Sequence, residues 1–398
     1  MDTVDSARRR MLSDVRTLPD EPVKLEQAWG RTLAQDLIAA RDQPPFRSSA
    51  MDGYACRQAD TGNSLRVVGE SAAGSGFERR VEAGEAVRIF TGAPVPEGAE
   101  VVVVQEQARV AGSEVTLPVV EKLGANIRVR GVDFPAGEVL LAQGRRLDGR
   151  AMALAAAAGF AEVSVARLPR IAVLATGPEV VPPGATPGVY QIYDSVSFGL
   201  AGLLTQWGAK SFNVASRADD AEVIADAVES AFAEADLLVT VGGASVGKYD
   251  VVKPALERFG LALLVDKVAV RPGKPTWYGR TTRGPVLGLP GNPAAALVCA
   301  YLFLRPLIDA MTGRDAAEGV TPVRARLRGK LAANGSFESF SRAALSLSPE
   351  GVLEVTPADR QDTSLLSVFA GSDALIRRAP GDGAAAEGDL VDVLLLKA

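Results

Sequence analysis

Apolar and polar residues follow three successive patterns along the chain. Between residues 65 and 139, short apolar runs alternate with glycine and proline, which predicts a small β domain. After Pro169, short apolar runs alternate with segments of helical period, which predicts an open parallel α/β sheet. Short strands return after Thr321 and predict a terminal β barrel or sandwich.

These patterns also place the individual elements. The predicted strands are 65–68, 86–90, 101–104, 115–117, 127–129, 171–175, 211–215, 237–241, 261–265, 268–270, 286–289, 324–328, 343–347, 352–355, 374–377 and 390–395. Helices are expected at 149–160, 195–207, from Asp219 or Asp220 to Phe232, at 250–259 and from Pro293 onward. Residues 1–40 fit two helices joined by a short extended piece.

The expected fold is therefore an α/β multidomain chain with four parts. An elongated N-terminal helical and mixed domain comprises 1–43 and 140–168, and a small β domain at 44–139 is inserted into it. A central open parallel α/β domain follows at 169–315, and a β-barrel domain at 316–398 ends the chain.

One glycine-rich turn is the strongest candidate for a binding site. The apolar strand 237–241 ends at Gly242, Gly243 and Gly247, and a helix is expected from Asp250. Backbone N–H groups of such a strand-to-helix turn can approach an anion closely. Asp250 could hold Mg²⁺ or orient a reacting oxygen, or it could simply cap the helix, and this segment alone leaves both readings open.

Two further turns have the same strand-to-helix position. Pro290-Gly-Asn-Pro293 follows the strand 286–289, and Asn292 as N-cap with Pro293 as first helical residue would leave bare N–H groups at the strand end. Asp219 with Glu222 has the spacing of a capping box, so a structural role is favoured for Asp219.

Cationic residues gather in two places. Lys267, Arg271 and Lys274 surround a glycine/proline turn and suit a phosphate clamp, although a solvated turn is the default interpretation. Arg128 and Arg130 lie at period two on a predicted strand, which puts both side chains on one face. A ligand with several negative charges and a solvated strand face explain that pair equally well.

Two loops of the N-terminal half present polar groups. Asp52-Gly53 signals a tight turn, so Asp52 by itself is more simply a turn carboxylate. The segment 90–96 is a proline-rich, rigid loop that presents the hydroxyl of Thr91.

Composition excludes several classes of function. The chain has no histidine, which rules out serine–histidine triads and histidine-ligated zinc or iron sites. Its two cysteines cannot form a disulfide framework, and the net charge of −5 provides no global field for nucleic acid or an anionic membrane. The charged start and the short apolar run 293–304 predict neither a signal peptide nor a membrane span, so a cytoplasmic location is expected.

Taken together, five segments resemble the molybdopterin molybdenumtransferase family, which includes the C-terminal enzymatic domain of gephyrin. They are Ser49-Ala-Met-Asp-Gly-Tyr-Ala55, Ile89-Phe-Thr-Gly-Ala-Pro-Val-Pro96, Gly242-Gly-Ala-Ser-Val-Gly247 with Tyr249-Asp250, Arg271-Pro-Gly-Lys-Pro275, and Leu289-Pro-Gly-Asn-Pro293. Each segment is weak evidence alone, but the set occurs in the family's order over nearly the whole chain.

The resemblance implies an enzyme that completes molybdenum cofactor synthesis. Adenylylated molybdopterin and molybdate would bind, the metal would be placed on the dithiolene sulfurs, and AMP would be released with Mg²⁺ present. The central domain would be the molybdopterin-binding domain, and Asp52 and Thr91 would lie on the substrate or molybdate side. It implies catalytic roles for Asp52, Thr91, Glu179 and Asp250, with Glu179 and Asp250 as metal ligands. Substrate-binding roles fall to Gly242, Gly243, Ser245, Gly247, Asp219, Asp220, Lys267, Arg271, Lys274, Pro290, Asn292, Pro293, Arg342, Ser364 and Ser367.

The resemblance also implies partners. Family members form homodimers with the active site near the subunit interface, and an adenylyltransferase and apo-molybdoenzymes are possible partners. Two other functions compete with metal insertion: the related adenylyltransferase, which would not need the additional β domains, and a non-catalytic scaffold, which would not need converging carboxylates. The chain departs from the family pattern at Pro178, Val196 and Lys248, and has Arg271 where lysine is common.

Overall fold

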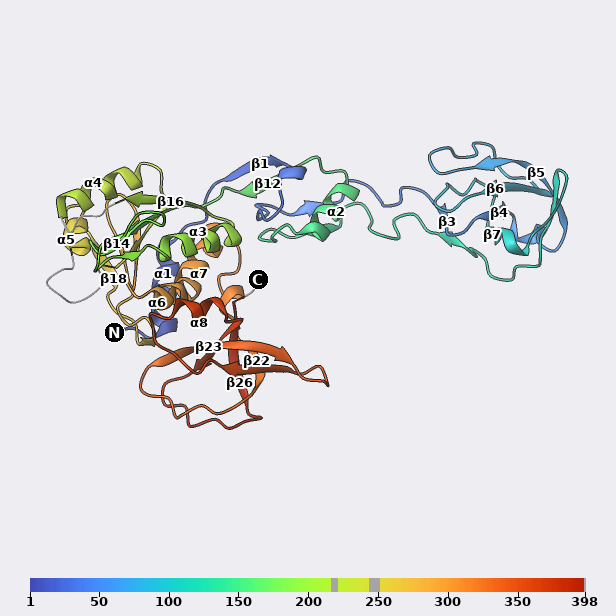
Figure 1. Cartoon of the computed structure of the whole chain (residues 1–398). Coiled ribbons are helices and arrows are strands. Elements are labelled where there is room, and N and C mark those ends of the chain that lie inside the picture. Colours follow the sequence, from blue (N-terminus) through green and yellow to red (C-terminus); the bar gives the residue numbers. More distant parts are fainter. Residues whose placement is uncertain (216–220, 243–250, 397–398) are drawn as a thin grey trace. The chain divides into compact units, whose positions relative to one another are not determined.

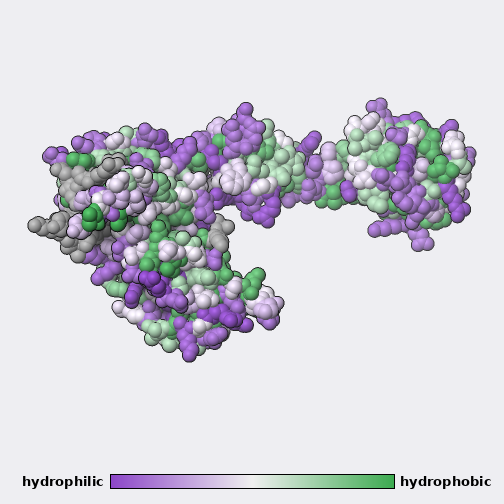
Figure 2. All heavy atoms as spheres, in the orientation of Figure 1, coloured by the Kyte–Doolittle hydropathy of each residue, from purple (hydrophilic) through white to green (hydrophobic). Residues whose placement is uncertain are grey.

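The computed structural model describes residues 1–215, 221–242 and 251–396 (Figure 1). The chain forms two compact units. The first unit comprises residues 1–22, 30–34 and 164–398, and the second comprises 23–29 and 35–163. The predicted division into four domains is finer than this and stays a prediction. Hydrophilic and apolar side chains are interspersed on the face of each unit that Figure 2 shows.

A mixed six-stranded sheet forms the centre of the first unit. Its order is β16-β13-β17-β21-β20-β18, with the first four strands parallel and β20 antiparallel to both neighbours. The strands are β13 (Arg170–Ala175), β16 (Lys210–Ala215), β17 (Leu237–Val241), β18 (Ala262–Val265), β20 (Trp277–Arg280) and β21 (Pro285–Leu289). The parallel α/β prediction is confirmed, whereas β20 was not predicted.

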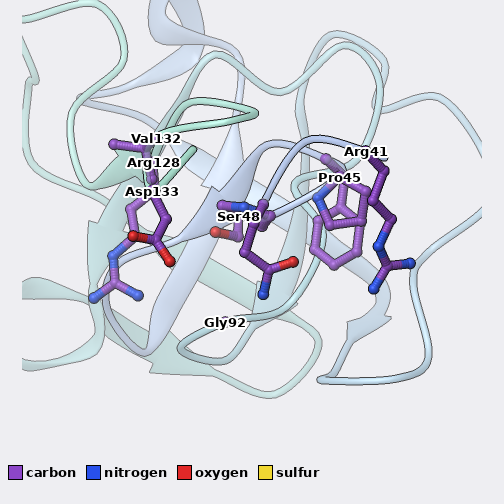
Figure 3. A pocket seen from close by; sticks show the side chains of 10 residues that line it. Arg41, Pro45, Ser48, Gly92, Arg128, Val132 and Asp133 are labelled. Atoms are coloured by element: carbon purple, nitrogen blue, oxygen red, sulfur yellow. The ribbon is translucent and has the colours of Figure 1, made fainter. Parts of the chain in front are cut away.

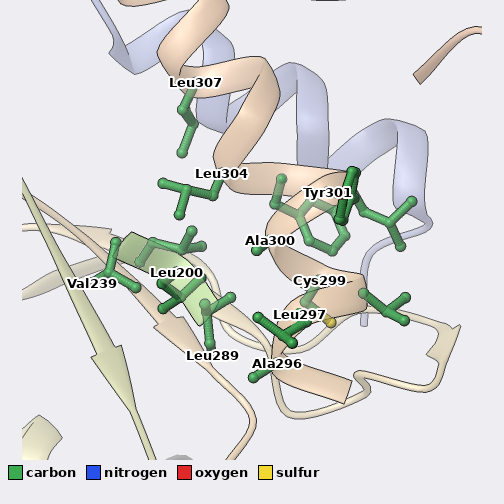
Figure 4. Close-up of a cluster of buried hydrophobic side chains, with 14 of the residues drawn as sticks. Leu200, Val239, Leu289, Ala296, Leu297, Cys299, Ala300, Tyr301, Leu304 and Leu307 are labelled. Atoms are coloured by element: carbon green, nitrogen blue, oxygen red, sulfur yellow. The ribbon is translucent and has the colours of Figure 1, made fainter. Parts of the chain in front are cut away.

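Helices cover both faces of this sheet, because its strands alternate apolar side chains between two cores. On one face Val173, Val239 and Leu289 pack with helices that Figure 1 shows side by side and Figure 4 shows from nearby. On the other face Leu174 and Leu238 pack with a second group of helices. The first group is α1 (Val4–Asp14), α3 (Val196–Trp207), α6 (Pro293–Cys299) and α7 (Arg305–Met311), and the second is α4 (Ala221–Phe232) and α5 (Val252–Glu257).

The central core helix begins at Pro293, as predicted. A π-helical stretch at Ala300–Leu304 joins α6 to α7, so the helix runs unbroken from Pro293 to Met311. Its 19 residues have the length and composition of a membrane span, but 89% of the most apolar window is buried in the fold. Leu297, Tyr301 and Leu304 fill the core instead of facing outward (Figure 4), so this is a core helix of the first unit.

A closed five-stranded barrel ends the chain, as predicted. The ring β23-β24-β22-β26-β25 closes because β25 pairs with β23, and β19 adds a short parallel edge to β23. Leu327, Val355, Ile376 and Val393 fill its interior. Its elements are β19 (Val270–Arg271), β22 (Val323–Leu327), β23 (Glu338–Leu347), β24 (Leu353–Pro357), α8 (Leu366–Ala370), β25 (Ala374–Arg378) and β26 (Leu390–Leu395).

The second unit contains the predicted small β domain. Its six-stranded sheet has the order β7-β4-β6-β5-β9-β8 and is antiparallel except between β5 and β6. The strands are β4 (Gly53–Cys56), β5 (Ser64–Ser71), β6 (Glu85–Ile89), β7 (Val101–Val104), β8 (Arg109–Ala111) and β9 (Glu114–Thr116). Outside this sheet, the same unit holds β2 (Leu37–Ile38), β3 (Ser48–Ser49), β10 (Ile127–Arg128), β11 (Val139–Leu141) and α2 (Gly149–Ala157).

Two local predictions were wrong. The first 40 residues contain one α-helix, α1, and continue into strand β1 (Asp20–Lys24), which pairs with β12 (Glu162–Ala166). Pro19 and Pro22 lack N–H groups and favour extended backbone, so a distant strand became the partner. Val268 forms only an isolated bridge, with Asp2, and the strand β19 begins at Val270. Two short strands, β14 (Val180–Val181) and β15 (Ile192–Tyr193), were not predicted.

Candidate functional site

The parallel strands of the first unit end at one edge. Ala175 is level with Ala215 and Val241, and Val241 is level with Leu289, so these four strands end side by side. Strand order reverses between β13 and β17, because β16 adds on one side of β13 and β17 on the other. Ligands of open α/β sheets bind at such a reversal, where neighbouring turns diverge.

The turns at this edge pack backbone against backbone. Thr176 N–H donates to Val241 O (3.1 Å), and Gly242 N–H donates to Leu289 O (3.4 Å). Gly242 has a φ of +83°, and a Cβ there would lie 3.1 Å from Thr176 O. A Cβ on Gly291, in the next turn, would lie 3.5 Å from Gly242 Cα, which is an ordinary contact distance. Glycine is therefore favoured at position 242, where a positive φ and a close carbonyl coincide.

Glu179 lies over the first of these turns. A Cβ on Gly177, whose φ is +128°, would stand 2.6 and 2.7 Å from the two carboxylate oxygens of Glu179. The carboxylate is exposed, and in the described part of the chain it has no ion-pair partner. Carboxylate oxygens are the donors that Mg²⁺ prefers, so Glu179 has the right chemistry for a metal ligand.

Several predicted residues lie outside the described residues. They are Gly243, Ser245, Gly247, Asp250, Asp219 and Asp220, and the capping-box prediction for Asp219 falls there too. Within residues 1–215, 221–242 and 251–396, no three acidic, cysteine or histidine side chains gather closely enough to bind a metal. Glu179 is the described member of the predicted metal pair.

The start of α6 differs from the prediction. Asn292 is the N-cap residue, but its side chain makes no capping bond. The carbonyl of Thr363 instead accepts from Ala294 N–H (3.1 Å) and Ala295 N–H (3.3 Å), while Asn292 Nδ2 donates to Thr363 Oγ1 (2.8 Å). The expectation of bare N–H groups at Pro290–Pro293 is therefore wrong for these two amides. A segment of the C-terminal region satisfies them, a long-range contact that no local pattern reveals.

Backbone and side-chain hydrogen bonds hold the turn that carries Lys267, Arg271 and Lys274. Thr276 donates its N–H (2.9 Å) and its hydroxyl (2.7 Å) to Gly273 O, and Val268 N–H donates to Lys274 O (3.2 Å). The second contact brings the backbones of Lys267 and Lys274 together. Lys274 Nζ lies 5.9 Å from the ring centroid of Phe337, whereas Arg271 is exposed and forms no ion pair among the described residues.

A polar cavity of about 370 Å³ opens beside this turn. Arg271 and Arg342 both line it, together with Gln361 and Thr363. Thr363 also binds the start of α6, so the cavity adjoins the carboxyl edge of the sheet. The remaining lining residues are Pro272, Leu331, Ala332, Ala333, Asn334, Ser339, Phe340, Ser341, Asp362 and Arg378.

Arg342 is the unusual residue of the cavity. Its side chain is 2% exposed, and burial lowers its pKa below the ordinary arginine value. Its Nε donates to Gln361 Oε1 (3.3 Å) and its Nη1 to Leu365 O (3.2 Å), but no described carboxylate lies within ion-pair distance. A buried guanidinium that lacks a full counter-charge favours a bound anion.

The two predicted C-terminal serines do not line the cavity. Ser364 donates its N–H (2.9 Å) and hydroxyl (2.5 Å) to Asp362 Oδ1, and Ser367 lies on α8. The hydroxyl-bearing residues that line the cavity are Thr363, Ser339 and Ser341 instead. These positions were missed because their proximity to Arg342 depends on barrel pairing, not on sequence spacing.

Asp52 and Thr91 meet in the second unit. Asp52 precedes β4 and Thr91 follows β6, and Gly53 pairs with Ile89 between these two strands. Asp52 Oδ1 accepts from Thr91 N–H (2.7 Å) and from Thr91 Oγ1 (2.8 Å). The backbone N–H, followed by the hydroxyl, holds the pKa of Asp52 below its ordinary value. The sequence-predicted pair is thus assembled with an ionised carboxylate.

A larger open hollow of about 790 Å³ lies in the same unit. Arg41 and Arg128 stand on opposite sides of Ser48 (Figure 3). Arg130, predicted to share a face with Arg128, instead forms an ion pair with Asp42 beyond the end of β10. That prediction was wrong because the strand ends before Arg130.

Comparison with known proteins covers the whole chain. The model of the MoeA N-terminal region (domain I and II) matches residues 2–159, the probable molybdopterin binding domain matches 172–310, and the MoeA C-terminal region (domain IV) matches 324–396. The chain is 34% identical to a molybdopterin molybdenumtransferase of Haemophilus influenzae, with 98% of each chain covered.

Two further similarities agree. A molybdopterin molybdenumtransferase of Bacillus subtilis is 32% identical, with 99% of this chain and 94% of the relative covered. A crystal structure of the molybdopterin biosynthesis MoeA protein of Pyrococcus horikoshii superposes with a TM-score of 0.85 at 30% identity, covering 100% and 99% of the two chains. The cation-lined cavity, the glycine turns and the Asp52–Thr91 pair thus lie in a chain that belongs to the molybdopterin molybdenumtransferase family of transferases.

Proposed function

We propose that this chain inserts molybdenum from molybdate into adenylylated molybdopterin, with Mg²⁺ present and AMP released, as the final step of molybdenum cofactor synthesis. Membership of the family supports the transferase activity. The observation that carries the substrate assignment is the buried, incompletely paired Arg342 beside Arg271 in a polar cavity.

The cavity suits a tetrahedral oxyanion such as molybdate. The described hydrogen-bond acceptors of Arg342 are neutral carbonyl oxygens, and Asp362 in the same cavity offsets its buried charge only in part, so a bound anion would supply further counter-charge. Arg271 approaches from the basic turn, and hydroxyls of Thr363 and Ser341 line the wall. Lys267 and Lys274 would bind the phosphate groups of the adenylylated substrate from the same turn.

The carboxyl edge of the sheet would receive the molybdopterin end of the substrate. Backbone groups of the glycine turns would contact it closely, as the meeting of Gly242, Gly291 and Thr176 supports. Glu179, and Asp250 from outside the described residues, would hold Mg²⁺, which would screen the phosphoanhydride charge. Glu179 supports this with an exposed carboxylate that has no described partner.

Asp52 would act on the reacting groups. Thr91 occupies its Oδ1 and keeps it ionised, and Oδ2 has no hydrogen-bond partner in the part of the chain that is described. An oriented carboxylate with one free oxygen can accept a proton during oxygen exchange at molybdate or orient attacking water. We assign that role to Asp52, with Thr91 orienting it.

Several wider assignments are part of the proposal. The chain would act in the cytoplasm as a homodimer whose active site lies near the subunit interface. It would receive substrate from an adenylyltransferase and pass the cofactor to apo-molybdoenzymes. Neither nucleic acid nor membrane would be a partner. The four-domain division of the sequence remains the working description of its parts.

The direct test supplies purified protein with adenylylated molybdopterin, molybdate and Mg²⁺. AMP release and activation of an apo-molybdoenzyme are followed together. The proposal expects both, and expects both to require molybdate. AMP release without active cofactor would instead indicate a hydrolase, and no AMP release would reject the proposed substrate.

A further inference from the structure

Arg88 has contacts on several sides, and it lies on the strand that pairs with β4, which follows Asp52. It lies on β6 directly opposite Tyr54 on β4. Its guanidinium carbon is 5.0 Å from the ring centroid of Tyr54 and 5.0 Å from that of Phe90. Two aromatic faces therefore fix the side chain, because a planar guanidinium stacks on such rings and loses little further freedom when it donates hydrogen bonds.

The two terminal nitrogens of Arg88 reach the chain around Asp52. Nη1 donates to Gly53 O (3.2 Å), and Nη2 donates to the side-chain oxygen of Gln105. Gln105 in turn donates its backbone N–H to Asp52 O (3.0 Å). The carbonyls of Asp52 and Gly53 are thus both held, one by Arg88 itself and the other by a residue that Arg88 binds.

We propose that Arg88 is a positioning residue for the Asp52–Thr91 pair, fixing the Asp52–Gly53 backbone so that the carboxylate meets Thr91. The inference rests on the proposed role of that pair in metal insertion. Arg88 acts through Gly53 and Gln105 and makes no described contact with the Asp52 carboxylate itself.

The positive charge of Arg88 also favours the ionised form of Asp52. The positive charge of Arg88 adds to the hydrogen bonds from Thr91 that hold the pKa of Asp52 below its ordinary value. An uncharged side chain at position 88 would lose the clamp and this contribution together. A lysine would keep the charge but could not copy the planar fork that reaches Gly53 O and Gln105 Oε1 at once.

A purely structural role would stabilise the β sheet without affecting Thr91. The two roles separate in an experiment with four proteins: wild type, Arg88→Met, Arg88→Lys and the control Arg66→Met. Methionine keeps an apolar stem between the rings. Arg66 lies on neighbouring β5, where its exposed side chain forms an ion pair with Glu85. It makes no described hydrogen bond to Asp52, Gly53 or Gln105, so it controls for the loss of an arginine from this sheet.

Amide hydrogen exchange at Thr91 and Gln105 is the first measurement, with the thermal midpoint recorded beside it. Arg88→Met should raise exchange at both amides about tenfold above any change at other β4 and β6 amides, because their acceptors on Asp52 move. Arg88→Lys should give a smaller increase and Arg66→Met none. Equal exchange in wild type and Arg88→Met overturns the proposal, and so does a uniform increase over the whole sheet.

Single-turnover metal insertion is the second measurement. Arg88→Met should lower the rate of insertion about tenfold with little change in the KM for molybdate, because the cavity around Arg342 is untouched. Faster exchange with an unaltered insertion rate overturns the positioning role. If wild type itself inserts no metal, the proposed function fails, while the exchange data still decide whether Arg88 fixes the pair.

Discussion

At the scale of single residues, the two candidate sites are built around charges of opposite sign, the Asp52 carboxylate and the Arg342 guanidinium. Asp52 keeps its negative charge because an N–H and a hydroxyl of Thr91 both donate to it. Arg342 is a buried cation that lines a polar cavity, and none of the described carboxylates lies at ion-pair distance from it. The first site therefore holds an ionised carboxylate, and the second holds a buried cation that favours an anion.

The effect of Thr91 on Asp52 can be measured directly. Thr91→Val removes the hydroxyl donor and leaves the backbone N–H, so the pKa of Asp52 should rise toward its ordinary value. Carboxyl NMR titration measures this, and Thr116→Val on the same sheet is the control. An unchanged Asp52 titration in Thr91→Val would show that the hydroxyl bond does not matter.

The lowered pKa of Asp52 also predicts how the free energy of unfolding depends on pH. The pKa of Asp52 is lower in the folded chain than in the unfolded chain, so its ionised form stabilises the fold above the ordinary aspartate pKa. That contribution is lost as the pH falls through the lowered folded-state value. Thr91→Val should therefore weaken the acid dependence of unfolding in that window and leave neutral pH dependence alone.

Loss of the Arg342 charge should weaken molybdate binding more than it slows the reaction. Arg342→Gln keeps hydrogen-bonding capacity but removes the charge, and should raise the KM for molybdate about tenfold with a smaller fall in kcat. Arg324→Gln, an exposed barrel arginine paired with Asp392, is the matched control. An unaltered KM in Arg342→Gln would place the oxyanion elsewhere.

At the scale of elements, the hydrophobic pattern predicted strands and helices that depend on local sequence. It missed features that depend on contacts between distant segments. The strands 101–104 and 237–241 and the helix ending at Trp207 were placed correctly, because each has its own apolar period. The second N-terminal helix was wrong, since residues 20–24 pair with residues 162–166. The capping of α6 by Thr363 also depends on a contact that no window of sequence contains.

Strand β4 offers a test of element packing. It lies between β6 and β7, and a Cβ on Gly53 would stand 1.9 Å from Val103 O. Gly53→Ala must push β4 from β7 and should lower the free energy of unfolding by about 1–3 kcal/mol, measured with denaturant. Gly202→Ala in α3 meets nothing within 4 Å and should be neutral or slightly stabilising. Equal stability of Gly53→Ala and wild type would contradict this register.

At the scale of the whole molecule, the order of short motifs predicted the family, and the comparisons confirm it. The resemblance implied site roles for Asp52, Thr91, Arg271 and Arg342, and the structure brings Asp52 to Thr91 and places both arginines at one cavity. It had associated Arg342 with Ser364 or Ser367, which do not line that cavity. It did not predict Arg88, Gln361 or Thr363, because their roles depend on strand register and barrel closure.

The proposed dimer predicts complementation between two impaired variants when molybdate is limiting. Asp52→Asn and Arg342→Gln change different units of the chain. If subunits share active sites, mixed dimers should regain part of the insertion activity, because some sites would then contain both native residues. Light scattering must first show that the mixture contains exchanged dimers. Exchanged dimers that are no more active than the average of the two parent variants would reject a site shared between subunits.

The central claim is that an ordered carboxylate and a buried arginine cavity together couple molybdate insertion to release of AMP. Single-turnover reaction of purified protein with adenylylated molybdopterin, molybdate and Mg²⁺ tests it most directly, with AMP and molybdenum cofactor both quantified. The account predicts equal amounts of the two products, with both lost in Asp52→Asn. AMP formed without molybdate, or cofactor formed at the wild-type rate in Asp52→Asn, would contradict it.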